Sequence, residues 1–195
     1  MSVYDLRSIS QGGTSEPFEL QVSRGQIPGH TPRNIFGTAT AIGTTFRTPW
    51  ELANTNALPF LSAQSQLTLS SSSASDTAVS ILVNGLDDNY ETVSEVVALN
   101  GLTGVTTTKQ FRFINDLITV AGNAVGLVSA KVGATTYAAI TAGYGRNQAA
   151  VYHVPAGHSF YLGRIDAFSA SANNDTKYLT FRNHNTFSDG RIFNV

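Results

Sequence analysis

The chain has 195 residues, of which 13% are charged, and its formal net charge is −1. Because charged residues make up about 25% of an average globular protein, neutral hydroxyl and amide groups must cover much of this surface. A nearly neutral chain also lacks the clustered Lys and Arg that displace counterions from a nucleic-acid backbone, which disfavours free nucleic acid as a partner.

Two absences narrow the class of protein further. The chain contains no cysteine, which excludes disulfides, thiolate nucleophiles and Cys-based zinc sites. Its first residues lack the basic start and apolar run of a signal peptide, and no run approaches the roughly 18 apolar residues of a membrane span. We therefore expect a chain made in a cytoplasm that does not cross a membrane.

The N-terminal part divides into an arm and a loop. Residues 1–25 mix Ser, Gln, Gly and Glu, and Gly12-Gly13 breaks any periodicity, so this part is either disordered or an arm that docks on a partner. Residues 26–37 contain Pro28 and Pro32, which predict a loop. The composition of residues 38–50 predicts one or two short strands, which Pro49 limits.

A serine tract follows the next predicted strand. Leu67 and Leu69 alternate with Thr68, and residues 70–77 then read Ser-Ser-Ser-Ser-Ala-Ser-Asp-Thr. Such a tract is either a flexible linker between domains or a turn inside one domain. Short strands of similar spacing on both sides favour the internal turn and a single domain over residues 26–195.

The segment from Val79 to Phe113 is the most informative for the fold. It reads as a strand, a tight turn at Asp87–Glu91, a second strand, an Asn100-Gly101 turn and the start of another strand at Lys109–Ile114. Asp, Asn and Gly supply the sharp reversals and positive φ that a meander of antiparallel strands requires.

Further short strands fill the rest of the chain. They are predicted at residues 117–120, 125–131, 135–140, 149–154, 159–168, 178–182 and 191–195. Many strands at spacings of about 8 to 12 residues predict an all-β fold, an antiparallel β-sandwich or jelly roll with an extended N-terminal arm. No helix of ten residues is expected.

A family resemblance follows from the order of these segments. Ile27-Pro28-Gly29-His30, the serine tract, Gly85–Glu91, Leu99-Asn100-Gly101 and Val154-Pro155-Ala156-Gly157 occur in a succession that resembles a family of tailed-phage virion structural proteins. That family is common among marine bacteriophages, including those of cyanobacteria, and the likeness runs from about residue 26 to 168. It implies a β-rich capsid-associated or tail-associated component without fixing its place in the particle.

The acidic turn is a weak candidate metal site. Asp87, Asp88 and Glu91 could bind Ca²⁺, which prefers several carboxylate and carbonyl oxygens, but a turn whose Asp and Asn side chains bond their own backbone is the favoured interpretation. Glu91 and Glu95 would lie about 13 Å apart on a strand, which is too far for a glycosidase pair and favours a solvated face.

The histidines and serines give no catalytic pattern. His153 and His158 bracket a turn and could ligate a metal together with Asp166, although surface or subunit-contact histidines are more common. No Gly-x-Ser-x-Gly elbow occurs. The sequence therefore predicts a protein that is not an enzyme and needs no cofactor.

Aromatic and arginine residues crowd the C-terminal third, where they serve either a sandwich core or an interface. The candidate interface residues are Tyr4, Leu6, Phe18, Tyr144, Arg146, Tyr152, Tyr161 and Arg164.

These observations together favour a non-enzymatic virion protein. The leading hypothesis is a homo-oligomer, in particular a trimer, that binds the major capsid protein and cements the outside of a phage capsid through its arm. One alternative is a receptor-binding or fibre-associated module that recognises host surface glycans. The other is a ring-forming head-tail adaptor or stopper.

Overall fold

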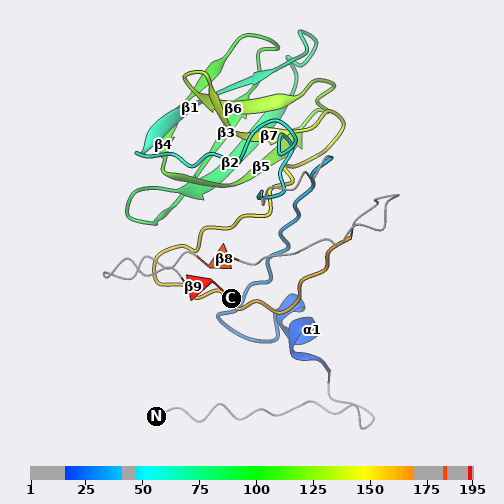
Figure 1. Ribbon diagram of the computed structural model, residues 1–195, viewed down its shortest axis with the longest axis vertical. Coiled ribbons are helices and arrows are strands. Elements are labelled where there is room, and N and C mark those ends of the chain that lie inside the picture. The colour runs from blue at the N-terminus through cyan, green and yellow to red at the C-terminus, as the bar shows by residue number, and fades with distance from the viewer. Residues whose placement is uncertain (1–15, 41–46, 169–181, 184–192, 195) are drawn as a thin grey trace. The chain divides into compact units, whose positions relative to one another are not determined.

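The computed structural model describes residues 16–40, 47–168, 182–183 and 193–194, and the chain forms two compact units, Met1–Phe160 and Tyr161–Val195 (Figure 1). The first unit contains the helix α1 (Phe18–Ser23). Its strands are β1 (Ser65–Ser71), β2 (Ser80–Leu86), β3 (Thr92–Ala98), β4 (Val105–Phe111), β5 (Phe113–Ala121), β6 (Val128–Val132) and β7 (Thr135–Ile140). In the second unit, β8 (Arg182–Asn183) pairs with β9 (Phe193–Asn194).

The seven longer strands form two antiparallel sheets. One sheet has the order β4-β1-β6-β7 and the other has the order β3-β2-β5. The inward side chains of both sheets form one hydrophobic core, so the architecture is a β-sandwich. The predicted all-β antiparallel sandwich is confirmed.

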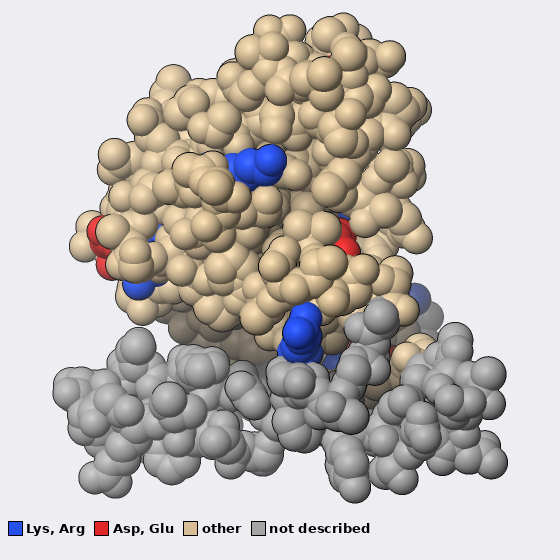
Figure 2. All heavy atoms as spheres, turned by 45° about the horizontal axis from the view of Figure 1, so that its top comes forward, with Lys and Arg blue, Asp and Glu red and all other residues tan. Residues whose placement is uncertain are grey.

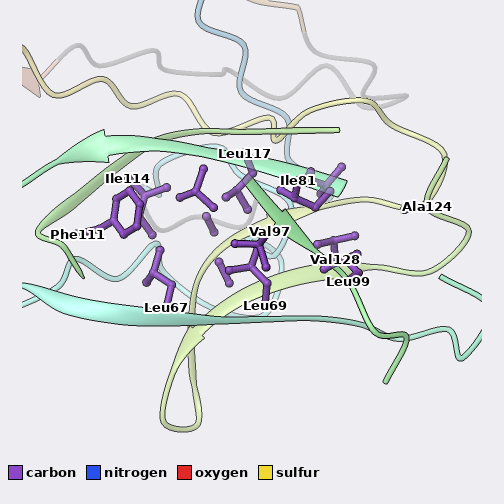
Figure 3. Close-up of a cluster of buried hydrophobic side chains, with 14 of the residues drawn as sticks. Leu67, Leu69, Ile81, Val97, Leu99, Phe111, Ile114, Leu117, Ala124 and Val128 are labelled. Carbon is purple, nitrogen blue, oxygen red and sulfur yellow. The ribbon is translucent and has the colours of Figure 1, made fainter. Parts of the chain in front are cut away.

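Alternation along each strand explains how the core is built. In β1, Leu67 and Leu69 are fully buried while Thr68 between them is not, and in β2 Ile81 and Val83 follow the same rule. Figure 3 shows Leu67, Leu69 and Ile81 among the core side chains between the sheets, together with Val97, Phe111, Ile114, Leu117 and Val128. The burial of these residues on both inner faces provides the main driving force for folding.

The chain changes sheet between β4 and β5 within a single residue. Arg112 separates the two strands, and its N–H donates to the carbonyl of Leu86 at 2.7 Å. The corner passes so close to β2 that a Cβ at Gly85 would lie 2.1 Å from the Phe113 carbonyl oxygen. Gly85 therefore permits the close approach of two backbones.

We expect Gly85→Ala to destabilise the protein by about 1–3 kcal/mol, because the added methyl group must displace backbone rather than a flexible side chain. Gly145→Ala is the matched control, since a Cβ there meets nothing within 4 Å. Urea unfolding of both variants measures the effect. Equal stability of the two variants would contradict this role of Gly85.

The serine tract is an internal turn that is tied to two other loops. The Asp76 carboxylate is 2% exposed and accepts hydrogen bonds from the Ser71 hydroxyl (2.5 Å) and from the backbone N–H groups of Val125 (3.0 Å) and Gly126 (3.0 Å). Its backbone carbonyl accepts the Gly101 N–H at 3.1 Å. The tract thus lies inside the sandwich domain, as the internal-turn interpretation predicted, and does not link two domains.

Both lateral margins of the sandwich are bridged between the sheets. On one side the Glu95 carboxylate of β3 accepts the N–H groups of Thr108 and Lys109 in β4, at 2.9 and 2.8 Å. On the other side, the segment after β7 bonds to β5 through Thr119 N–H to the Gly145 carbonyl (2.8 Å). Such bridges occupy backbone groups that an edge strand would otherwise leave open.

The predicted meander is wrong in one respect. β2 and β3 form the expected hairpin, but β4 pairs with β1 in the opposite sheet. The Asn100-Gly101 turn therefore carries the chain across the sandwich, although Gly101 has the expected positive φ of 57°.

Several strand boundaries also differ from prediction. The two strands predicted at 109–114 and 117–120 are in fact β4 and the continuous β5, with the corner at Arg112. Residues 149–154 and 159–168 contain no strand, and neither do the described residues of 38–50. In 149–154 the backbone bonds to loops and side chains, for example Ala150 N–H to the Pro49 carbonyl (2.9 Å), so strand composition there has no neighbouring strand to pair with.

The chain divides into units at a different place from the predicted boundary between residues 25 and 26. The sandwich strands lie within residues 65–140, whereas the single domain was predicted over 26–195, and residues 161–195 form the separate second unit. The predicted arm includes α1 in its described part. Residues 1–15 and most of 178–182 and 191–195 lie outside the described residues.

Candidate functional site

A cavity of about 250 Å³ lies against the outward side of the sheet β3-β2-β5, and we call it the outer-face cavity. Its floor is formed by the Asn84 side chain of β2 and by Asn115, Asp116 and Ile118 of β5. Its walls are two segments without regular structure, residues 32–36 and 146–152. Asn84 faces outward because the preceding residue, Val83, points into the core.

The floor and one wall are joined by specific contacts. Asn84 is the register partner of Asp116 on the adjacent strand, and Asp116 forms an ion pair with Arg146 of the wall. Asn147 fixes the same wall, because its Oδ1 accepts the Leu117 N–H at 2.9 Å while its own N–H donates to the Leu117 carbonyl at 3.0 Å. Arg146 therefore stands at a defined place beside the carboxylate.

Asn115 holds the continuation of this wall through His153. The Asn115 Oδ1 accepts the His153 backbone N–H at 2.7 Å, and the Asn115 Nδ2 donates to the His153 carbonyl at 2.8 Å. This pair of bonds fixes the orientation of the amide, so the imidazole Nδ1, 3.1 Å from the same Oδ1, must carry the proton. The neutral tautomer of His153 is therefore protonated at Nδ1.

Aromatic rings surround this imidazole. The Phe113 ring stacks on it with centroids 4.5 Å apart, Phe60 meets it edge-on at 5.8 Å, and Tyr90 stacks on Phe113 at 5.1 Å. The Arg112 guanidinium lies 4.7 Å from the Phe113 centroid. Burial, and next the positive charge of Arg112, lower the pKa of His153 to about 4.

Several polar groups in the outer-face cavity have no protein partner among the described residues. The hydrogen bonds of the described residues use neither the Asn84 amide nor the Nδ2 of Asn147. The Nε of Arg146 is also unbonded, but this atom is buried away from solvent. The lining residues thus combine donors of Arg and Asn with acceptors of Asp and Asn. This is the arrangement of a binding site rather than of a packed core.

The acidic turn is organised by its own backbone. The Asp87 Oδ1 accepts the N–H groups of Asn89 (2.8 Å) and Glu91 (2.9 Å), and Asp88 forms an ion pair with Arg112 at 3.4 Å. The turn places Tyr90 at a positive φ of 62°, from which its ring stacks on Phe113. The Asp87 side chain therefore stabilises the turn, the turn positions the Tyr90 ring, and we do not propose a calcium site here.

The other residues predicted as possible metal ligands are His153, His158 and Asp166, and each has a different environment. His153 is half-buried among the rings, His158 is exposed, and Asp166 of the second unit forms an ion pair with Arg164 at 2.9 Å. Over the described ranges, no group of three His, Cys, Asp or Glu side chains could hold a metal ion. Glu95 bonds β4, as described above, rather than facing solvent beside Glu91.

Among the predicted interface residues, Arg146 and Tyr152 are brought together as walls of the outer-face cavity. Tyr144 is half-exposed on the preceding turn, and Phe18 is half-exposed on α1. Tyr161 and Arg164 belong to the second unit, where both are exposed. Tyr4 and Leu6 lie outside the described residues.

Sequence reasoning missed the polar residues of the floor. Asn84 and Asp116 each occupy an outward position within an apolar strand, next to core residues Val83 and Leu117. A polar side chain at such a position is ordinary on a solvated face. Nothing in the sequence shows that residues 32–36 and 146–152 cover this face and convert it into a cavity.

Comparison with known proteins identified no relative: no family model, curated protein or solved structure matches the chain. None of the helices in the described part of the chain has the length and apolar character needed to cross a membrane.

Proposed function

We propose that this protein is a non-enzymatic structural subunit of a phage virion that decorates and cements the capsid. The observation that carries the proposal is a set of exposed apolar side chains on segments outside the sandwich strands. They are Phe18, Leu20, Ile35, Phe36, Phe60 and Phe160 in the first unit, and Tyr161, Leu162, Ile165 and Phe168 in the second.

Exposed apolar side chains that follow one another along one segment, such as Tyr161, Leu162, Ile165 and Phe168, are typical of a surface that another protein covers. Phe168 is 96% exposed and Tyr161 is 77% exposed, and both lie on chain without regular structure. A segment of this kind gains both main-chain hydrogen bonds and apolar contacts when it docks on a neighbouring subunit. The bridged margins of the sandwich favour docking through these segments over pairing through its edges.

The surface of the sandwich fits a component of a crowded shell. Figure 2 shows one face on which Lys, Arg, Asp and Glu are few and scattered, so identical copies repel one another weakly. The resemblance of residues 26–168 to tailed-phage virion proteins supports the same role. We place the protein in the virion, as a homo-oligomer and specifically a trimer, with the major capsid protein as its partner.

We test this with capsid shells made with and without the protein. The variant Tyr161→Asp/Phe168→Asp is expected to lower occupancy on shells about ten-fold or more, because charges replace buried apolar contacts. Val125→Asp is the matched control, since Val125 is 64% exposed on the loop between β5 and β6, and it should bind as the parent does.

Copy number in a cryo-electron-microscopy map separates the proposed role from the alternatives. A decoration trimer repeats over the whole capsid surface, whereas an adaptor or stopper forms one ring of subunits at a single vertex. Wild-type occupancy by Tyr161→Asp/Phe168→Asp, or absence of the protein from capsid faces, would refute the cementing role.

A further inference from the structure

We infer that the outer-face cavity binds one saccharide unit, with a carboxylated sugar favoured over a neutral one. The cavity shares Ile35 and Phe36 with the exposed apolar segments of the assembly role, but Tyr161 and Phe168, which the assembly test changes, are not among its lining residues. Seven of the fourteen residues that line it carry amide, carboxylate or guanidinium groups. At about 250 Å³, it is slightly smaller than the pockets of roughly 300–1,000 Å³ that hold drug-sized ligands, which leaves room for one small polar molecule.

The chemistry of the floor selects a polyhydroxylated ligand. Each sugar hydroxyl both donates and accepts a hydrogen bond, so neighbouring hydroxyls are matched by a donor and an acceptor side by side. Asn84 supplies both kinds of group in one amide, and Asp116 next to it supplies acceptors. The unbonded Nδ2 of Asn147 supplies a further donor.

The walls supply the apolar contact and the charge. Tyr152 and Phe36 both line the cavity, and aromatic rings can cover the C–H face of a sugar. The lining contains two guanidinium groups, those of Arg33 and Arg146, and one carboxylate, that of Asp116, so it carries one net positive charge. A carboxylated sugar such as a hexuronate complements this charge.

Other ligand classes fit this lining less well. A divalent cation requires several oxygen ligands of negative charge, but Asp116 is the one carboxylate among the lining residues and is already paired with Arg146. A phosphate monoester carries a charge of about −1.5 to −2, which exceeds the single net positive charge of the lining, whereas a carboxylate carries one negative charge. A hydrophobic ligand would leave the Asn and Arg groups of the lining desolvated without partners.

The test titrates the full-length protein with D-glucose, N-acetyl-D-glucosamine and D-glucuronate at millimolar concentration, using saturation-transfer NMR and calorimetry. We expect saturable binding at one site, with glucuronate binding most tightly. Asn84→Ala should weaken binding about five-fold or more through the loss of at least one hydrogen bond. Arg33→Ala should weaken glucuronate binding selectively, and it alters a wall segment rather than a strand.

Asn123→Ala is the matched control, because Asn123 is exposed on the loop between β5 and β6 and does not line the cavity. It should bind within about two-fold of the parent protein, and circular dichroism checks that every variant is folded. A glucuronate oligosaccharide that binds more tightly than the monosaccharide would identify a polysaccharide as the source of the unit; equal affinity would identify the free sugar.

Two results would overturn the inference. The first is that no sugar of the panel binds the wild-type protein. The second is that folded Asn84→Ala and Asn123→Ala bind the panel with equal affinity, which would place any sugar contact elsewhere. Shell occupancy is measured separately, so failure of this site leaves the assembly test unaffected.

Discussion

Asp76→Ala is expected to destabilise the protein by about 3–5 kcal/mol, because it removes the shared acceptor of three hydrogen bonds to a carboxylate. The substitution leaves the Ser71 hydroxyl and the Gly126 N–H without their acceptor in a buried place, and the Val125 N–H without its acceptor in a partly buried one. Each buried polar group left unsatisfied costs about 1–3 kcal/mol. Because the whole domain has a stability of only about 5–15 kcal/mol, this one change removes a large part of it.

Asp88→Ala is the control, since the Asp88 side chain is 56% exposed and its ion pair with Arg112 spans 3.4 Å. Exposed pairs of this kind contribute about 0–1 kcal/mol. Unfolding in urea is followed by circular dichroism and by fluorescence of Trp50, the single tryptophan, which is 1% exposed in the folded protein. Similar losses in the two variants would show that Asp76 does not tie the three loops together.

The Asp76 carboxylate also leads to a prediction of how the stability of the protein changes at acid pH. Burial raises the pKa of Asp76, but the hydrogen bonds from Ser71, Val125 and Gly126 outweigh it and leave the pKa below its ordinary value of 3.8. The folded state therefore holds the proton less tightly than the unfolded state does. The stability that the Asp76 carboxylate contributes is fully present above about pH 4 and is lost as the pH falls through its lowered pKa.

The sequence predicted most of the sandwich because its strands are locally specified. In β1, β2 and β7 the apolar residues and the turn residues agree on where each strand lies, and β7 occupies the predicted residues 135–140. The serine tract was placed correctly as a turn. Local pattern could not show that Asp76 lies at its centre, because its partners Val125 and Gly126 are about 50 residues away.

The errors have a common physical origin. The composition of residues 149–154 and 159–168 indicates side chains that suit a β-strand. A strand forms only where another strand lies beside it to accept and donate backbone hydrogen bonds. In 149–154 the backbone partners are Pro49 and Asn115. The same segment supplies a wall of the outer-face cavity, so the sequence failed where the fold departs from regular structure and where the candidate site lies.

His153 is expected to make the stability of the protein fall by about 3 kcal/mol as the pH is lowered from 6.5 to 4. Its folded pKa is about 4, whereas its ordinary value is 6.5. Below pH 6.5 the unfolded state binds a proton that the folded state refuses, so protonation favours unfolding at about 1.4 kcal/mol per pH unit. Well above pH 6.5 both states are neutral at this residue and its contribution to stability is complete.

The reason for the low pKa is the set of groups around the imidazole. The Nδ1 proton is used by Asn115, while Phe60 and Phe113 contact the ring and Arg112 is the charged neighbour. A second proton at Nε2 would place a positive charge among apolar rings, near the guanidinium. The ring is therefore held neutral by the contacts that fix residues 152–154 onto β5.

His153→Phe removes the titrating group and keeps a ring that can stack on Phe113, so its stability should lack the fall that His153 causes in the parent between pH 6.5 and 4.5. His158→Phe is the matched control, because His158 is exposed, and it should keep the pH dependence of the parent. Burial raises the pKa of Glu51, which makes folding more favourable as the pH falls, but this opposing effect is common to all three proteins. The comparison between variants therefore isolates His153, and parallel stability curves for the parent and His153→Phe would mean that the folded protein tolerates a charged imidazole in the aromatic stack.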